Sequence, residues 1–576
     1  MYNLHPGLIL ILTGVVTLFL PYQKLRSGAA LAGAVLALAA MIFMGDGGLT
    51  YDFTSAIQFQ LLAVDGLSRA FGLIFCVIAV IAGIYSLGTV SRYEKCASLL
   101  YAGSSLCVVF AGDWISLVCF WELMAVSSWY LVWAGGTHRA KRASYRYLAM
   151  HFFGGNLLLA GAVWLCTIQG GFEIGLLTGG SGGAYWLILL GVAVNGAIPP
   201  LHTWVADAYP ESTAAGTVYM GSYTTKVAIY ALIRLFAGTE DLIIIGGVMA
   251  VLAACMALIE NDLRRLLSYH IISQLGMMVA ALGTGEAAGI DGATLHAAFN
   301  ILYKGVLLMA AGAVITVTGK RKISDLGGLA KKLPVTAGCF FIASLSIAGM
   351  PFLNGFASKA LIMESLHGHV VGYWLVMLAG VGTWLSITLK INYFVFFGKT
   401  EKDVPCGKVP VYMDIAMVIG AALCLLTGLF PDFCYSLMPG ATMAHPFTLE
   451  HILEYLGLFI GGTVPFVMLL PMMAPHDMLS LDFDWFYRRW IPKLLMGLSK
   501  YVYWFFEQFE QIYDHSVLIC RFILRHPMKI FSNLHELKEL DDEGEGTFEG
   551  EVPVGAFMQI FLIFCIIAFL VILILE

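Results

Sequence analysis

Long apolar runs alternate with short polar connections along almost the whole chain. A helix needs roughly 20 consecutive, mostly apolar residues to cross a hydrocarbon core about 30 Å thick. Runs of this kind recur about sixteen times, and they predict an all-α, polytopic membrane protein of about sixteen transmembrane helices. They occupy residues 6–20, 29–44, 66–88, 97–112, 114–134, 148–168, 184–199, 213–236, 242–260, 266–283, 295–317, 335–362, 372–397, 411–431, 451–473 and 555–575.

Two short signals interrupt this pattern inside apolar runs. Pro199 and Pro200 end one run, and Pro351, followed by Gly355, interrupts another. Helix breaks at membrane depth are tolerated where protein or a wet cavity surrounds them. A break in each half of a transporter often marks the transport site. We therefore expect two broken helices at such a site, with ordinary proline kinks as the alternative.

The pattern changes after the fifteenth run. Residues 475–554 are charged and aromatic, and residues 493–533 alternate apolar and polar positions at helical spacing, which is typical of an amphipathic helix on a membrane surface. This segment is either a spacer that tethers the last helix or a strap across neighbouring helices or subunits, and the pattern favours the strap. The predicted divisions are N-terminal helices 1–95, a core 96–400, C-terminal helices 401–474, a lateral amphipathic segment 475–554 and an anchor 555–576.

Composition agrees with a lipid environment. Of the 576 residues, 59% are hydrophobic and 12% charged, and the mean hydropathy is +0.83, which excludes an ordinary water-soluble domain. The net charge of −6 is too small to indicate a nucleic-acid partner. The twelve cysteines are scattered singly, without the C-x-x-C pairs that hold zinc or an iron–sulfur cluster. We therefore expect no metal and no cofactor, and electron transfer, if any, elsewhere.

The basic residues predict the topology. Every Lys and Arg outside the expected spans falls in connections on one side of the membrane, and the opposite connections have none. Because Lys and Arg in short loops are retained in the cytoplasm, this side is the inner one. The chain is then a multi-pass protein of the cell (inner or plasma) membrane, with both termini outside.

Several ionisable residues lie in the middle of apolar runs. Each costs about 2.5–3.5 kcal/mol on insertion scales, so such residues persist only where they face protein or water. They predict a proton or cation path. The path residues are Glu122, Lys226, His296, Lys304, Lys359 and Lys390, and the polar residues expected near them are His151, Asn195, His202, Asp207 and Asn300.

Three of these residues form a ladder. His296, Asn300 and Lys304 follow one another at intervals of four, so they lie on one helix face over about 12 Å. Histidine titrates near neutral pH, and a buried lysine can exchange its proton. A lone buried histidine is more often structural, but this one shares its face with a lysine. For Glu122 the alternative is a fixed ion pair.

Four sequence blocks resemble those of a known family. Residues 201–208 (LHTWVADA), 226–234 (KVAIYALIR), 261–269 (NDLRRLLSY) with 272–276 (ISQLG), and 355–359 (GFASK) are similar to the signature blocks of antiporter-like subunits. That family is shared by respiratory complex I, Mrp-type Na⁺/H⁺ antiporters, membrane-bound hydrogenases and formate hydrogenlyases. The resemblance runs from about residue 65 to residue 399.

The resemblance implies two inverted five-helix repeats, each with a broken helix. It implies that Glu122 is the entry residue, that Lys226 and Lys304 relay charge beside His296, and that Lys359 is the exit residue. It also implies homologous antiporter-like subunits and small membrane subunits as partners. The chain departs from the family at Asn195, where a lysine is usual, and at Asn300, where a second histidine is usual.

These observations predict a subunit that moves H⁺, and possibly Na⁺, within a larger membrane complex, closest to the Mrp D-type group. Since asparagine cannot take up or release a proton at neutral pH, Asn195 leaves two possibilities open. Either Lys226 pairs with Glu122 instead, or the first half-channel is degenerate and the chain is largely a scaffold of a membrane redox complex. A self-sufficient transporter of a small solute is a further alternative.

Overall fold

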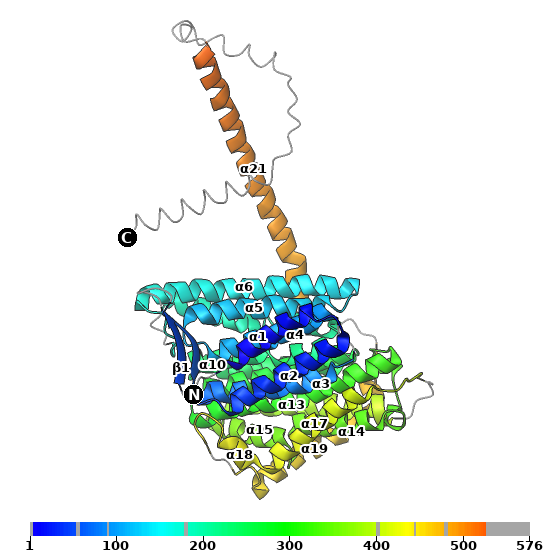
Figure 1. Cartoon of the computed structure of the whole chain (residues 1–576). Coiled ribbons are helices and arrows are strands. Elements are labelled where there is room, and N and C mark those ends of the chain that lie inside the picture. Colours follow the sequence, from blue (N-terminus) through cyan, green and yellow to red (C-terminus); the bar gives the residue numbers. More distant parts are fainter. Residues whose placement is uncertain are drawn as a thin grey trace. The chain divides into compact units, whose positions relative to one another are not determined.

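Two units make up the chain, residues Met1–Asp484 and Trp485–Glu576. The computed structural model describes residues 4–45, 47–52, 58–88, 91–177, 182–398, 404–442, 445–476 and 482–525 (Figure 1). The expected last span, 555–575, lies outside the described residues, and so does the end of the amphipathic segment.

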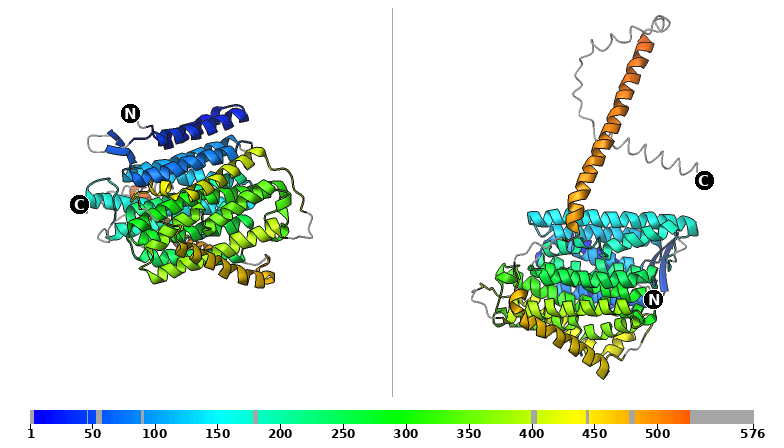
Figure 2. Two further views of the ribbon diagram at one scale, coloured as in Figure 1. Left: turned by 90° about the horizontal axis from the view of Figure 1, so that it is seen from below. Right: turned by 180° about the vertical axis from the view of Figure 1, so that it is seen from behind.

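The N-terminal half of the first unit consists of helices that lie side by side (Figures 1 and 2). They are α1 (Pro6–Phe19), α2 (Gln23–Ile42), α3 (Gly66–Tyr85), α4 (Arg92–Phe110), α5 (Trp114–Trp133), α6 (His138–Gln169), α7 (Gly182–Asn195), α8 (Thr203–Ala208), the 3₁₀ turn η2 (Tyr209–Glu211), α9 (Ala214–Ser222) and α10 (Thr224–Phe236).

The rest of this unit continues the bundle. Its elements are α11 (Asp241–Ile259), α12 (Leu263–Gly283), α13 (Ala287–Thr318), the 3₁₀ turns η3 (Ile323–Asp325) and η4 (Leu329–Lys331), α14 (Pro334–Ala348), α15 (Asn354–Ser365), α16 (Val370–Thr383), the π-helical η5 (Trp384–Phe397), α17 (Val411–Leu429), α18 (Pro431–Tyr435), α19 (Leu449–Met468) and α20 (Leu470–Met473).

Ten of the described helices are long and apolar enough to cross a membrane, and α1, α7 and α14 are shorter apolar helices. Large apolar side chains such as Phe19, Trp164 and Trp374 remain exposed on the helices. Lipid rather than water suits such a surface. The structure thus confirms a mostly helical, multi-spanning chain, while the count of sixteen spans stays a prediction.

Short polar residues fix where several helices begin. Asp65, Asp113 and Asp262 accept hydrogen bonds from the first backbone N–H groups of α3, α5 and α12. These N–H groups have no partner within the helix, and a side-chain cap stabilises them by about 1 kcal/mol. The apolar runs therefore start directly after a capping residue, which is a signal visible in the sequence.

Both expected helix breaks are present. Helix α7 ends at Asn195, and the chain passes Pro199 and Pro200 before α8 begins. Helix α14 ends at Ala348, and Pro351 precedes α15. At Gly355 any side chain would clash with the carbonyl oxygen of Ser346, so only glycine allows this approach of α15 to α14.

A third break interrupts a run that the sequence predicts as one continuous helix, 213–236. Helix α9 ends at Ser222, Tyr223 lies between the two helices at φ −109° and ψ −76°, and α10 begins at Thr224. No proline marks this site. The break frees the carbonyl of Gly221, which accepts a hydrogen bond from Lys226 Nζ at 2.8 Å.

The expectation of an all-α chain is wrong in one place. Strands β1 (Gly47–Asp52) and β2 (Gln58–Val64) form an antiparallel hairpin between α2 and α3. Alternation of glutamine with apolar residues in 58–61 is the signal that the sequence offered. The hairpin is fixed to the α4–α5 connection because Asp113 accepts a hydrogen bond from the Gln60 N–H at 2.8 Å.

Helices α12 and α13 form the centre of the first unit. Helix α13 contacts α3, α9, α12, α14, α15 and α17, and the apolar stretch of α12 is buried throughout. Polar side chains on these two helices therefore face protein and not lipid. This placement satisfies the condition under which buried ionisable groups are tolerated.

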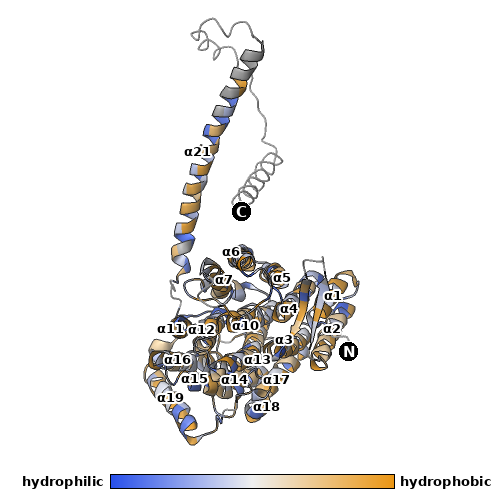
Figure 3. Ribbon diagram, turned by 90° about the vertical axis from the view of Figure 1, so that its left-hand side faces the viewer, coloured by the Kyte–Doolittle hydropathy of each residue, from blue (hydrophilic) through white to orange (hydrophobic). Residues whose placement is uncertain are grey.

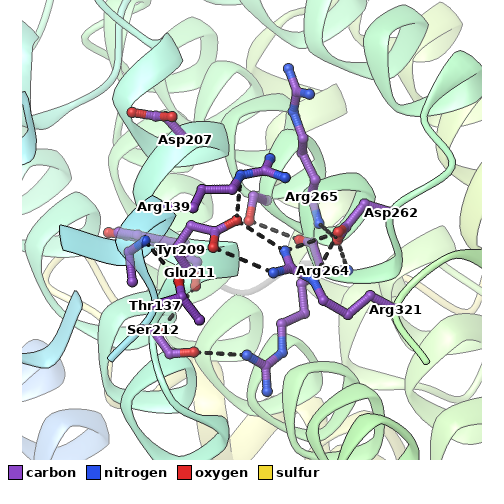
Figure 4. A network of polar contacts seen from close by, with 12 residues as sticks. Thr137, Arg139, Asp207, Tyr209, Glu211, Ser212, Asp262, Arg264, Arg265 and Arg321 are labelled. Carbon is purple, nitrogen blue, oxygen red and sulfur yellow. Dashed lines mark hydrogen bonds and ion pairs between the residues drawn. The ribbon is translucent and has the colours of Figure 1, made fainter. Parts of the chain in front are cut away.

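A network of arginines and carboxylates joins connections at one end of the bundle (Figure 4). Glu211, in η2, pairs with Arg139 of α6 at 3.0 Å and with Arg321 at 3.2 Å. Arg321 also pairs with Asp262 at 2.9 Å, and Arg264 donates to the Ser212 carbonyl at 2.8 Å. The distribution of Lys and Arg predicts that these connections lie on the same side of the membrane. In the structure they contact one another.

In the second unit, α21 (Asp484–Arg525) is one long helix with Pro492 inside it. Apolar and polar residues alternate along it (Figure 3). The described part of the expected helix 493–533, residues 493–525, is therefore helical, and α21 begins earlier, at Asp484.

Arg321→Ala should destabilise the fold. The Glu211 side chain is only 3% exposed, and without Arg321 a buried carboxylate loses one of its two charged partners. We expect a loss of about 1–3 kcal/mol, measured by unfolding in mixed detergent micelles. Arg139→Ala is the matched control, because Arg139 is 66% exposed and its ion pair is worth less than about 1 kcal/mol. Equal losses in the two variants would contradict this assignment.

Candidate ion-translocation site

The expected path lysines all lie inside the bundle. Lys226 and Lys304 are completely buried, Lys390 is 2% exposed and Lys359 is 3% exposed. His296 is completely buried as well. The helices that carry them are α10, α13, η5 and α15. Four amines at such depth require specific polar partners.

Three of these amines bind carbonyl oxygens at helix ends. Lys226 Nζ donates to the Gly221 carbonyl, which the α9–α10 break exposes. Lys359 Nζ donates to the carbonyls of Ile347 and Ala348, at 2.8 and 3.0 Å, where α14 breaks off. Lys390 Nζ donates to the carbonyls of Leu258 and Glu260 at the end of α11, at 2.6 and 2.9 Å. Helix C-termini carry partial negative charge, so they stabilise the ammonium groups.

Lys304 differs from the other three. Its amine is fully buried and has no hydrogen-bond partner among the described residues. The charge of Lys226 acts on it. An unpartnered buried amine is costly to the stability of the fold.

His296 is the centre of a hydrogen-bonded cluster. Its Nδ1 lies 2.8 Å from Ser358 Oγ, and its Nε2 lies 3.1 Å from Gln274 Oε1 and 3.3 Å from the Tyr303 hydroxyl. The Asn300 amide donates to the same hydroxyl at 3.2 Å. The predicted ladder on α13 is therefore buried, and its His296 bonds Ser358, which directly precedes Lys359 in the sequence.

Sequence reasoning missed Gln274, Tyr303, Ser358 and His270. Gln274 stands in one of the family-like blocks, which was a usable signal. His270 is completely buried on α12, and its Nε2 lies 2.5 Å from Ser386 Oγ. A single histidine in an apolar helix gives no sign of such a position.

Glu122 stands apart from the lysines. Its half-buried carboxylate packs on α6 so closely that any side chain at Gly155 would clash with it. Among the described residues, Glu122 has no cation within 4 Å. The alternative that Lys226 pairs with Glu122 is wrong in this structure, since Lys226 bonds the Gly221 carbonyl and Thr225 Oγ1.

His151 and Asn195 face each other on α6 and α7. The His151 ring is packed between Tyr147 and Trp204, with centroids 4.1 and 4.5 Å away. Trp204 also donates to the Val194 carbonyl at 2.9 Å. The first break thus has a neutral indole donor where the second has Lys359.

His202 and Asp207 lie in other contacts. Asp207 accepts two hydrogen bonds from Arg146 at 2.7 and 2.9 Å. His202 Nε2 lies 3.3 Å from Asp482, which also accepts a hydrogen bond from Tyr269 at 2.8 Å. Burial raises the pKa of the Asp482 carboxyl, but the hydrogen bond from His202 and the other contacts outweigh it and hold the pKa below its ordinary value. These contacts of His202 and Asp207 therefore involve Asp482 and Arg146 and not the path lysines.

Among the described residues, no three His, Cys, Asp or Glu side chains are grouped so that they could hold a metal ion. The site instead consists of amines, imidazoles, hydroxyls and amides. These groups can pass protons along hydrogen bonds.

Lys304→Met should stabilise the protein. Methionine has a similar volume and removes an unpartnered amine from the interior, which we expect to add about 1–3 kcal/mol to the free energy of unfolding in mixed micelles. Lys359→Met is the matched control, because two buried carbonyls would lose their donor and no gain should follow. A loss of stability in Lys304→Met would show that its amine has a firm partner.

Comparisons with known proteins identify the family of the chain. A family model described as "NADH:quinone oxidoreductase/Mrp antiporter, TM" matches residues 111–386. The D-type subunit of the Na⁺/H⁺ antiporter of Alkalihalophilus pseudofirmus is 32% identical over 358 residues, which cover 58% of this chain and 72% of the relative. The A1-type subunit of the Na⁺/H⁺ antiporter of Staphylococcus haemolyticus is 29% identical, and the match covers 74% of this chain but spans only 59% of that longer relative.

Solved structures show the same fold. A chain of the Mrp complex from Dietzia matches with a TM-score of 0.66 and 20% identity, over 79% of this chain and 95% of the other. A chain of respiratory complex I from Thermus thermophilus matches with a TM-score of 0.66 and 22% identity, over 76% and 100%. The chain belongs to the antiporter-like subunit family shared by NADH:quinone oxidoreductases and Mrp antiporters.

Proposed function

We propose that this multi-pass membrane subunit moves protons, or exchanges them for a monovalent cation, inside a multi-subunit complex. The observation that carries the proposal is the set of four buried lysines, three of which bond helix-end carbonyls instead of carboxylates. A carbonyl accepts a hydrogen bond from the ammonium and from the neutral amine alike. The lysines can therefore gain and lose protons without losing their partners.

The proposed path starts near Glu122 and runs through Lys226, Lys304 and His296 to Lys359. Its support is electrostatic interaction among the lysines and His296. The charge of Lys226 acts on Lys304, and the charges of Lys226 and Lys359 act on His296. Two unit charges about 10 Å apart repel by roughly 1.7 kcal/mol at an effective dielectric constant of 20, so each arrival shifts the next proton equilibrium more than tenfold.

The proposed architecture is two inverted repeats, α4–α10 and α11–η5. The order of elements supports it. In each group the fourth expected span is a broken helix, which is α7–α8 in the first group and α14–α15 in the second. The fifth span of the first group is divided at Tyr223 into α9 and α10, and the fifth span of the second group changes from α16 to the π-helical η5.

The proposal also covers the membrane location, the C-terminal segment and the partner subunits. Positive charges support an inner-membrane location with both termini outside. The pattern of α21 supports a helix that lies on the membrane surface, followed by an anchor at 555–576. Relatives named as Na⁺/H⁺ and probable K⁺/H⁺ antiporter subunits, and fold neighbours in Mrp and complex I assemblies, support homologous membrane subunits as partners.

A scaffold role is the second candidate. Asn195 at the first break and the unpaired Glu122 favour it, since neither forms the charged pair usual in the family. In that case the first half would hold neighbouring subunits together without conducting.

Lys304→Met should abolish translocation while the complex still assembles. The amine is the only ionisable group that the ladder places between Lys226 and the His296 cluster, and methionine cannot carry a proton. Proton movement would be followed with a pH-sensitive dye in liposomes that contain the intact complex, with assembly checked by native electrophoresis. A wild-type rate in this variant would refute the conduction proposal.

Asn195→Lys separates the two candidates. A weak first half-channel should gain activity, because the new amine would lie beside His151 and could form the charged relay that is missing. Asn195→Met is the control for bulk. An unchanged rate in both variants, measured in the same liposomes, would favour the scaffold.

A further inference from the structure

A second polar line leaves the His296 cluster along α12. Gln274 accepts from His296, and His270 lies one helical turn earlier on the same helix. Both side chains are completely buried. The His270 ring bonds Ser386 on η5 through Nε2, and its Nδ1 has no hydrogen-bond partner among the described residues.

The line continues from Ser386 to Lys390. Both residues lie on η5, four positions apart. Lys390 bonds the carbonyl of Glu260, and the Glu260 carboxylate pairs with Arg265 at 3.3 Å. Arg265 belongs to the end of the bundle where the arginine network lies (Figure 4). Polar groups thus extend from the buried His296 cluster to that end.

The position of His270 is electrostatically central. The charges of Lys304, Lys359 and Lys390 all act on its ring. Its other neighbours on this line, Gln274 and Ser386, have no ionisable group. His270 is therefore a titratable side chain on the line between Lys390 and His296.

We propose that His270 relays protons between Lys390 and the His296 cluster, as an access route to the second half of the subunit that is separate from the Glu122 route. This inference rests on the proposed translocation function. The two ring nitrogens explain the chemistry. A proton binds the free nitrogen, the proton on the other nitrogen leaves, and rotation of the ring or return of a proton resets it. No net charge needs to stay among the lysines.

The alternative is a purely structural hydrogen bond between α12 and η5. In that case a glutamine, which can still bond Ser386, would replace the histidine without effect on transport. A relay needs the imidazole itself. The two ideas therefore differ in what His270→Gln does to proton movement in an assembled complex.

The test measures initial proton flux in liposomes that contain the intact complex. We expect His270→Gln to lower the rate about tenfold or more at normal assembly, and Ser386→Ala to lower it by a smaller factor. His5→Gln is the matched control, because His5 is also a buried histidine but lies just before α1. A wild-type rate in assembled His270→Gln would overturn the relay.

A double variant separates a route from a structural effect. If His270 and Lys390 act on one route, His270→Gln combined with Lys390→Met should be no slower than the slower single variant, whereas independent structural damage would multiply the losses and overturn the relay. Should His270→Gln fail to assemble, Ser386→Ala with Lys390→Met gives the same comparison.

Lys304→Met keeps the two proposals distinct. If it is inactive while His270→Gln is normal, only the relay fails; if it is active, the translocation proposal itself fails.

Discussion

The structure depends on bonds between buried lysine amines and the carbonyl ends of broken or terminating helices. A helix end leaves carbonyls without partners and carries roughly half a negative charge. In hydrocarbon, neither these carbonyls nor an ammonium is tolerable alone. Lys226 at Gly221, Lys359 at Ile347 and Ala348, and Lys390 at Leu258 and Glu260 satisfy both requirements at once. The breaks in α9–α10 and α14–α15 are therefore part of the site, since without them these carbonyls would be bonded within a helix.

Arginines and buried lysines have different kinds of partner in this structure. At the end of the bundle shown in Figure 4, Arg139, Arg321 and Arg265 pair with carboxylates and hold connections together. Arginine stays charged at every physiological pH, so these pairs are permanent. Inside, lysines bond carbonyls, which do not ionise and leave the amine free to change its protonation state. Lys304 lacks even that partner among the described residues. Its burial without a partner therefore works against stability.

Much of this organisation was visible in the sequence. The lysines stood out because each interrupts an apolar run, and Pro199, Pro200 and Pro351 marked two breaks. The break at Tyr223 carries no proline signal. The carbonyl that it frees, at Gly221, is bonded by the amine of Lys226 only five residues later, and lysine is not a residue that marks a helix break. The partners of the lysines are backbone carbonyls. Every residue has one, so the sequence cannot indicate which carbonyl binds a lysine. His270 resembled an ordinary buried histidine until η5 brought Ser386 to 2.5 Å from it. The hairpin β1–β2 was missed because its connection lacks a tight-turn motif.

The carbonyls freed at the two helix breaks bind different kinds of donor. At the second break, the freed carbonyls of α14 bind the Lys359 amine. At the first break, the Val194 carbonyl binds the indole N–H of Trp204, and Asn195 stands where the family has a lysine. Indole is a donor only and cannot ionise. The first break is therefore satisfied without charge, whereas the second is satisfied by an ionisable amine. Of the four buried lysines, Lys226 lies on α10, and Lys304, Lys359 and Lys390 lie on later helices, where the buried His270 and His296 also lie. The larger share of the buried ionisable groups is therefore in the second half of this unit.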